Sequence, residues 1–310
     1  MALVEFGSYI DSHVHVMSER RIRSGVSWVA KSGWDTGVDP ESATPESLVE
    51  EIRADGFEYF FNLFFPIPPT AGRPSPANSR EIMEWQHDFC RRTPGAIPFV
   101  SVDVNDADYL EVVDTALNRY NFAGFKVHPY TQQVNLTDPR MEPIYEAVAA
   151  AGKIFVSHTG FADFYHGPEL SDQVAVVIER HPELTFVAAH MLYPYLDKAE
   201  RWLQEYENFY LDLTNVQGMM KIDEDERRPS FEQYISILER FSDRIMFGSD
   251  LPMAIGPHRE LLNETLELPI SDEAKANILR HTALRLLDKT GWPIATYWQG
   301  SMAGQALGDD

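Results

Sequence analysis

The feature that most constrains the fold of this 310-residue chain is a regular alternation of short apolar runs with longer segments of helical periodicity. The runs are rich in Val, Ile, Phe and Tyr, as strands buried on both faces are, and they close on polar residues. Strands separated by helices form a parallel sheet. The eight predicted strands are Tyr9–His15, Phe57–Phe65, Ile97–Val104, Ala123–Pro129, Lys153–Gly160, Thr185–Met191, Phe209–Asn215 and Arg244–Asp250.

Helical patterns lie between these runs and close the chain. Their predicted ranges are Pro45–Asp55, Asn78–Arg92, Asp108–Tyr120, Pro139–Ala151, Ser171–Arg180, Phe231–Phe241 and Asp272–Lys289. Eight strand–helix units favour an α/β fold with a closed (β/α)8 barrel, the TIM barrel, over an open sheet. No repeat or linker divides the sequence. We therefore predict a single domain over residues 1–300, followed by a small polar tail, 301–310, that is expected to be disordered.

The connections after the first, second and seventh predicted strands exceed the usual length of about two to six residues. They are Val16–Pro40, Pro66–Ala77 and Val216–Pro229. All three follow the carboxyl ends of strands, which is where a barrel of this kind carries its site. Arg73 lies on the second of them, and its guanidinium would suit a substrate carboxylate. A solvated loop arginine is the commoner explanation.

The charge of the chain narrows the range of partners. A formal net charge of -22 repels a phosphate backbone and anionic lipid, so neither nucleic acid nor a membrane is an expected partner. Cys90 is the only cysteine, so no intrachain disulfide forms, and apolar packing is its expected role. No secretory signal pattern is present, and no apolar run approaches the roughly 20 residues of a membrane span. The cytoplasm is the expected location.

Asp11, His13 and His15 occupy alternate positions of the first predicted strand. The period of two in a strand would place all three side chains on one face. A carboxylate and two imidazoles are costly to bury unless something neutralises or coordinates them, and a divalent metal does both. Taken alone, the motif is explained about equally well by satisfied core or surface histidines.

Chemically similar residues end several other predicted strands. They are Lys126 and His128 on the fourth strand, His158 on the fifth, His190 on the sixth and Asp250 on the eighth. Zinc holds its nitrogen and oxygen ligands at about 2.0–2.2 Å, so a ligand set must converge within a few ångströms. The first and last strands are neighbours in a closed barrel but are far apart in an open sheet. The ligand pattern and the barrel therefore support each other.

This combination of motifs resembles the amidohydrolase superfamily. Asp-x-His-x-His on the first strand, His158, His190 and Gly-Ser-Asp250-Leu-Pro carry the resemblance. More narrowly, the chain is similar to the amidohydrolase-2 branch, which includes enzymes like aminocarboxymuconate-semialdehyde decarboxylase. Gly124–Pro129 and the late segment Asn277-Ile278-Leu279…Leu286-Leu287 fit that branch as well. The resemblance covers roughly residues 9 to 290; it is specific for the superfamily and weak for the substrate.

The resemblance implies a divalent metal, usually zinc, at the mouth of the barrel. Carried over to this sequence, the metal ligands are His13, His15, His158 and Asp250. His190 would polarise the bound water or the substrate, and Asp250 would carry the proton. In two-metal members a lysine of the fourth strand is carbamylated, and Lys126 occupies a plausible place for it, so the number of metals stays open, with one preferred. A homodimer is common in the superfamily.

The roles of four further residues are less firmly defined by the sequence. Asp11 is expected to orient a ligand rather than to bind metal. For Lys126, a buried ion pair with a strand-end acid such as Asp103 is as good an explanation as a role in the site. His128 either lines the site or anchors a loop. His258 follows the eighth strand and could rim the pocket, but no role is assigned to it.

The leading functional hypothesis is a metal-dependent hydrolase that acts on a small-molecule amide, lactone or ester through an activated water. Its rival is a non-oxidative decarboxylase on the same scaffold, for which cationic pocket residues such as Arg73 would be the sign. Either reaction implies a small-molecule substrate, and the second implies a carboxylate. A non-catalytic binding protein that keeps the barrel is the third hypothesis, and the retention of every expected ligand position argues against it.

Overall fold

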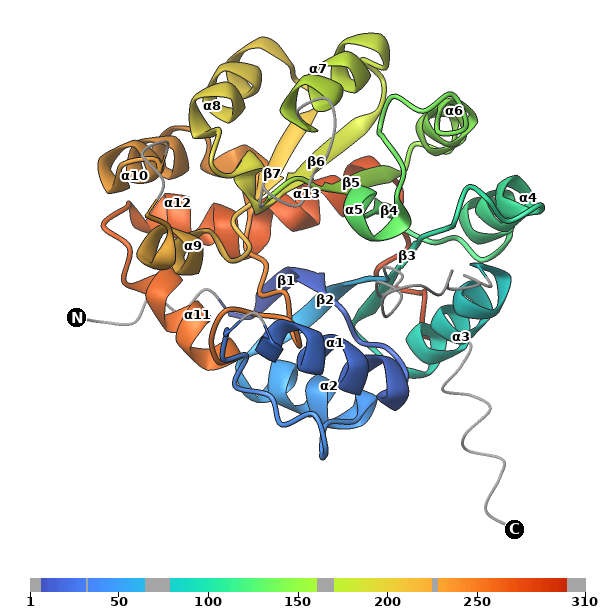
Figure 1. Cartoon of the computed structure of the whole chain (residues 1–310), viewed down its shortest axis with the longest axis horizontal. Coiled ribbons are helices and arrows are strands. Elements are labelled where there is room, and N and C mark those ends of the chain that lie inside the picture. The colour runs from blue at the N-terminus through green and yellow to red at the C-terminus, as the bar shows by residue number, and fades with distance from the viewer. Residues whose placement is uncertain (1–6, 32, 65–78, 161–169, 225–227, 300–310) are drawn as a thin grey trace.

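The structure is a computed structural model that describes residues 7–31, 33–64, 79–160, 170–224 and 228–299. Eight parallel strands follow one another in sequence order and form a nearly closed barrel with helices around it (Figure 1). The predicted α/β class and TIM barrel are confirmed. The strands are β1 (Tyr9–Val14), β2 (Phe57–Leu63), β3 (Ala96–Val100), β4 (Gly124–Val127), β5 (Ile154–His158), β6 (Thr185–Ala189), β7 (Phe209–Asp212) and β8 (Ile245–Met246).

Each predicted helical range contains a helix. The helices are α1 (Glu19–Lys31), α2 (Pro45–Ala54), α3 (Ser79–Arg92), α4 (Tyr109–Asp114) with the π-helical turn η1 (Thr115–Arg119), α5 (Pro129–Gln132), α6 (Glu142–Ala150), α7 (Leu170–Arg180), α8 (Leu196–Glu205), α9 (Val216–Ile222), α10 (Phe231–Arg240), α11 (His258–Leu266), α12 (Asp272–Ala276), η5 (Asn277–His281) and α13 (Thr282–Lys289). None of these helices is long and apolar enough to cross a bilayer.

The strands bury both faces, because their side chains alternate between two apolar cores. On β2, Phe61 and Leu63 pack in the inner core of the barrel, whereas Phe60 packs in the outer core between strands and helices. On β4 Phe125 and Val127 also pack in the outer core, and the same alternation turns Lys126 on β4 and His158 on β5 toward the barrel interior. The period of two therefore aims the polar strand ends at one place.

The ring closes between β1 and the segment that follows β8. Ser12 N donates to Phe247 O at 2.8 Å, Asp250 N donates to His13 O at 2.8 Å, and Val14 forms a parallel bridge with Leu251. β8 itself spans only two residues, fewer than the predicted Arg244–Asp250, because the chain after Met246 leaves β7 and bonds to β1 instead. This closure brings the first and last strand ends together.

The long connections after the first and seventh strands are not plain loops. The first contains α1, and the last contains α9. The second, Pro66–Ala77, lies outside the described residues, together with Arg73 and the predicted tail 301–310.

Aromatic side chains close the opposite, amino-terminal end of the barrel. Trp298 stacks on Tyr59 with ring centroids 5.9 Å apart, and its Nε1 donates to Cys90 O at 3.0 Å. Trp292 Nε1 donates to Asn121 O, just before β4, at 2.9 Å. Cys90 is fully buried, and burial raises the pKa of its thiol, so its expected packing role is confirmed.

We expect Trp298→Ala to lower the free energy of unfolding by about 3–5 kcal/mol, because it removes a large side chain from the closed end of the inner core. Chemical denaturation followed by circular dichroism measures this change. The metal content should stay at the wild-type value, since the strand ends that carry His13 and Asp250 lie at the other end of the barrel. A loss of metal without a loss of stability would contradict this separation.

Candidate active site

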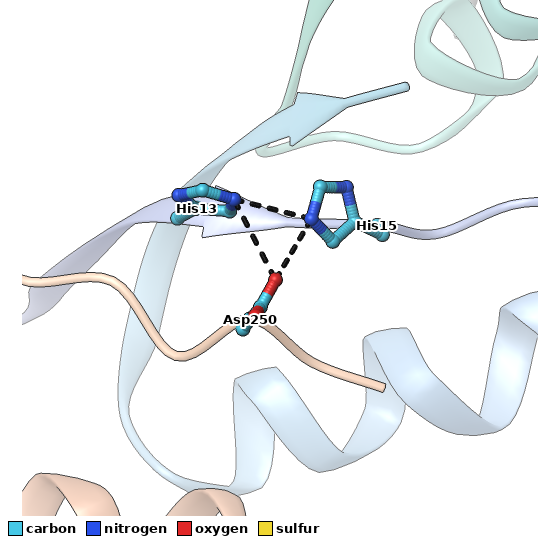
Figure 2. A group of neighbouring side chains, drawn as sticks. All are labelled: His13, His15 and Asp250. Atoms are coloured by element: carbon cyan, nitrogen blue, oxygen red, sulfur yellow. Dashed lines mark hydrogen bonds and ion pairs between the residues drawn. The ribbon is translucent and has the colours of Figure 1, made fainter. Parts of the chain in front are cut away.

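Three potential metal-binding atoms converge at the mouth of the barrel (Figure 2). His13 Nε2 lies 3.1 Å from His15 Nε2 and 3.5 Å from Asp250 Oδ1, and His15 Nε2 lies 2.9 Å from Asp250 Oδ1. Neighbouring ligands at about 2.0–2.2 Å from one ion are themselves about 3–3.5 Å apart. The spacing of these three atoms therefore fits a single divalent cation.

The outer nitrogens of the two imidazoles face acceptors. His13 Nδ1 lies 2.9 Å from Asp212 Oδ2, and His15 Nδ1 contacts the carbonyl oxygen of Leu63. A carboxylate and a carbonyl only accept, so in the neutral rings the hydrogen lies on Nδ1 and the Nε2 lone pair points inward. Two lone pairs and a carboxylate oxygen that face one another repel unless a cation lies among them. The donor set thus fits a metal by its chemistry as well as by its spacing.

Asp212, at the end of β7, is a site residue that the sequence analysis missed. It is fully buried. Besides its contact with His13, its Oδ1 accepts from His190 N at 2.9 Å and from Thr214 N at 3.2 Å. One carboxylate therefore orients the ring of His13 and the backbone that carries His190. Asp212 is the only charged residue of the predicted strand Phe209–Asn215, and that was the available signal.

Asp250 stands in the left-handed region with φ 70°, a conformation that Asp tolerates better than most residues. Its Oδ2 accepts from Asn215 Nδ2 at 2.7 Å, which leaves Oδ1 for the two histidines. Burial alone would raise the pKa of Asp250, but the adjacent His15, His13 and His190 lower it below its usual value. The carboxylate is therefore ionised at neutral pH.

Lys126 is fully buried, and its Nζ lies 3.3 Å from His13 Nε2. Burial lowers the pKa of Lys126 to about 8, against the opposing effect of Asp212 and Asp250. The alternative partner considered from the sequence, Asp103, bonds to Asn105 in the next turn instead. His13 Nε2 has one lone pair, which could accept from the Lys126 ammonium or bind a cation, but not both.

His158 and His128 form a stacked pair beside the converging atoms. Their ring centroids are 3.8 Å apart with planes at 9°, and His158 Nε2 lies 3.0 Å from the carbonyl oxygen of Gly160. Burial lowers the pKa of both rings well below the usual value, so both are neutral. The structure therefore places His158 at the mouth but not among the three converging atoms.

His190 follows the end of β6 in a left-handed turn, η3 (His190–Leu192), whereas the strand was predicted to reach Met191. Its ring centroid lies 4.5 Å from that of His158 and 5.1 Å from that of His13. His190 Nδ1 lies 3.0 Å from the carbonyl oxygen of Thr214. Burial lowers the pKa of this ring, although Asp250 and Asp212 oppose the effect.

Two glycines permit these close approaches. A Cβ atom on Gly248 would lie 2.6 Å from His13 Cβ and 2.1 Å from Thr214 Oγ1, and a Cβ atom on Gly160 would lie 2.6 Å from His190 Cβ. Real Cβ atoms do not approach so closely, so any side chain at either position would displace a histidine of the site.

Asp11 does not share a face with the two histidines, so that prediction is wrong. The register of β1 against β2 shifts between Asp11 and Val14, and the carboxylate turns toward α11, where His258 Nε2 lies 3.2 Å from Asp11 Oδ2. Asp11 Oδ1 accepts from His13 N at 3.0 Å. His258 is fully buried behind β1, so it does not rim the pocket.

The fold and this donor set are those of barrel proteins that carry a potential metal site at the carboxyl ends of their strands. A profile of the amidohydrolase family matches residues 10–289, and the chain belongs to this family. It is therefore an enzyme of the amidohydrolase superfamily, in the amidohydrolase-2 branch, and the hypothesis of a non-catalytic binding protein is set aside. No protein in a curated collection matches the chain.

Solved structures with the same fold cover nearly the whole chain. A TIM-barrel protein from Bordetella bronchiseptica is 20% identical over 92% of this chain and 99% of its own, with a TM-score of 0.71. The 5-carboxyvanillate decarboxylase of Novosphingobium aromaticivorans, complexed with manganese and 4-hydroxy-3-methoxy-5-nitrobenzoic acid, is 14% identical over 92% and 97%, with a TM-score of 0.63. The 4-oxalomesaconate hydratase of Rhodopseudomonas palustris is 14% identical over 96% and 100%, with a TM-score of 0.58.

We expect Asp212→Asn to weaken metal binding by about 10- to 100-fold, because the amide cannot accept from His13 Nδ1, His190 N and Thr214 N together. Competition with a chromophoric chelator measures the affinity. Asp223→Asn is the control, since Asp223 accepts from Tyr193 Oη away from the three converging atoms. Equal affinities in Asp212→Asn and the wild type would show that Asp212 does not orient His13.

Proposed function

We propose that this enzyme is a metal-dependent hydrolase that acts on a small-molecule amide, lactone or ester. The observation that carries the proposal is the convergence of His13 Nε2, His15 Nε2 and Asp250 Oδ1, with both imidazoles held so that their lone pairs face inward. Buried lone pairs arranged in this way are costly unless they bind a cation. Membership in a family of metal-dependent enzymes supports the same proposal.

The proposed cofactor is one divalent cation, zinc in the first instance. His13, His15 and Asp250 would hold it, and His158 would complete the set once its Nε2 leaves the carbonyl of Gly160. Two nitrogens and a carboxylate oxygen suit zinc, but a decarboxylase of the same fold binds manganese, so the ion has to be identified by elemental analysis. When bound, such an ion supplies Lewis acidity, which polarises a carbonyl and makes water more acidic.

Asp250 is the proposed general base and acid. Its lowered pKa keeps it ionised at neutral pH, so it can accept a proton from the attacking water and return that proton to the leaving group. The bond from Asn215 Nδ2 to Oδ2 fixes the orientation of the carboxylate for both transfers.

His190 is the proposed stabiliser of the developing oxyanion. The contact of its Nδ1 with the carbonyl oxygen of Thr214 places one hydrogen there, so donation to an oxyanion uses a second hydrogen on Nε2. Burial outweighs the negative charges of Asp250 and Asp212 and lowers the pKa of His190, so this doubly protonated form is the minor one at neutral pH.

A second candidate reaction is non-oxidative decarboxylation, which Lys126 favours. Its buried ammonium lies beside the converging atoms and would meet a substrate carboxylate there. Arg73, the cation first considered for this role, lies outside the described residues. In either reaction the proposed substrate is a small molecule, with a carboxylate group in the second.

We expect His13→Ala to abolish metal binding and His158→Ala to weaken it less, since His158 stands outside the three converging atoms. Inductively coupled plasma mass spectrometry of purified, metal-supplemented protein gives the stoichiometry. Unchanged metal content would remove the substituted residue from the ligand set. Two ions per chain, or the mass of one added carboxyl group on Lys126, would replace the one-metal proposal by a carbamate-bridged pair.

We expect Asp250→Asn to lower kcat by about 10²- to 10⁴-fold, the usual contribution of a general acid–base residue.

The reaction is identified by incubating the metal-loaded enzyme with lactones and with hydroxybenzoates in ¹⁸O-labelled water. Incorporation of ¹⁸O into the product supports hydrolysis. Release of carbon dioxide without incorporation of ¹⁸O would replace hydrolysis by decarboxylation.

A further inference from the structure

Three buried charged residues form a connected row from the helical layer to the backbone beside the proposed metal ligands. It consists of Asp55, at the end of α2, His258, the first residue of α11, and Asp11 on β1. The exposed fractions of the three residues are 7%, 0% and 0%. None of the proposed catalytic steps uses these three residues, yet burying two carboxylates and an imidazole has a high desolvation cost.

His258 bridges the two carboxylates. Its Nδ1 lies 2.5 Å from Asp55 Oδ2, and its Nε2 lies 3.2 Å from Asp11 Oδ2. Because a carboxylate acceptor faces each nitrogen, both nitrogens carry hydrogens and the ring is an imidazolium. Burial lowers the pKa of His258, but the bonds and charges of Asp11 and Asp55 outweigh this effect, and the pKa is raised.

The other oxygen of Asp11 holds the two segments that carry the metal ligands. Asp11 Oδ1 accepts from His13 N and from Ser249 N, both at 3.0 Å. His13 is a proposed ligand on β1, and Ser249 directly precedes Asp250. The shift of register in β1 falls between Asp11 and Val14, so a side chain serves as the acceptor where the ladder is irregular. The carboxylate therefore links β1 to the segment after β8 at the level of the metal centre.

We propose that His258 is a positioning residue: by bridging Asp55 and Asp11 it fixes the Asp11 carboxylate, which in turn sets the spacing between His13 and Asp250. This inference rests on the proposed metal site. His258 acts through Asp11 and touches none of the three converging atoms. Its loss should therefore widen or disorder the ligand triangle without removing a ligand.

The charged groups around His258 come from three elements. α2 contributes Asp55 and the half-buried Glu51, β1 contributes Asp11, and α11 contributes Arg259, whose Nη2 lies 2.6 Å from Asp55 Oδ1. Phe57 of β2 packs against the ring with centroids 4.9 Å apart. Arg259 offsets part of the charge of Asp55, so the imidazolium remains available to Asp11.

The direction of the pH effect follows from the raised pKa. The favourable contribution of His258 is fully present below its unfolded pKa of about 6.5 and is lost as pH rises through the higher folded value. The advantage in metal binding that His258 gives the wild type should therefore shrink as pH rises through the folded pKa of His258.

The test compares His258→Gln with His181→Gln. His181 is a matched control, because it is also a buried histidine beside carboxylates, with Nε2 3.2 Å from Glu142 and Nδ1 3.8 Å from Glu183, but far from the metal centre in the helical layer at α7. The dissociation constant for Zn²⁺ is measured with a competing chelator at several pH values between about 6.5 and 8.5, and stability is measured by urea denaturation.

We expect His258→Gln to weaken Zn²⁺ binding by about tenfold near pH 6.5, and we expect its difference from the wild type to narrow toward pH 8.5. His181→Gln should lose stability but keep the wild-type affinity and profile. If His258→Gln does not fold, Asp55→Asn removes the charge on the far side of the ring and should reproduce the same changes. Wild-type Zn²⁺ affinity and pH profile in the His258 or Asp55 variant would overturn this inference. Equal weakening of Zn²⁺ binding in the His181 variant would do the same. Either outcome would leave the proposed function intact. A wild type that binds no metal would overturn the proposed function as well.

Discussion

The structure at the mouth of the barrel has to overcome the mutual repulsion of three electron-rich atoms. His13 Nε2, His15 Nε2 and Asp250 Oδ1 are held at 2.9–3.5 Å from one another, where without a cation they would push apart. The surrounding structure resists that push. Asp212 and the carbonyl of Leu63 fix the two rings, and Asn215 fixes the carboxylate. The neighbouring groups are therefore arranged so that the three atoms can bind a cation.

Closure of the barrel makes this arrangement available. The two histidines and the aspartate are 235 or more residues apart in sequence, and only the bonds between β1 and the segment after β8 bring them together. Gly248 lies at this junction and has no side chain, which leaves room for Thr214 Oγ1 and His13 Cβ beside it. The fold and the site consequently depend on the same few backbone contacts.

Much of this architecture could be predicted from the sequence, because the alternation of apolar runs with helical segments is a local property of the chain. The eight strands, their order and the position of Lys126 and His158 at the mouth follow from that alternation. The inward or outward turn of Asp11 does not, since an irregularity of register in β1 reverses the expected face. Asp212 was missed and His258 was left without a role for a related reason. Each contacts a partner that is almost 200 or more residues away, and no spacing along the chain records such a contact.

The aromatic closure at the amino-terminal end has a consequence for how the protein is made. Trp292 and Trp298 are synthesised after all eight strands, and they cover surfaces of Tyr59, Cys90 and Asn121 that emerge from the ribosome much earlier. Until translation reaches these residues, the base of the barrel is an open apolar surface. During that interval the uncovered surface is exposed to association with other chains.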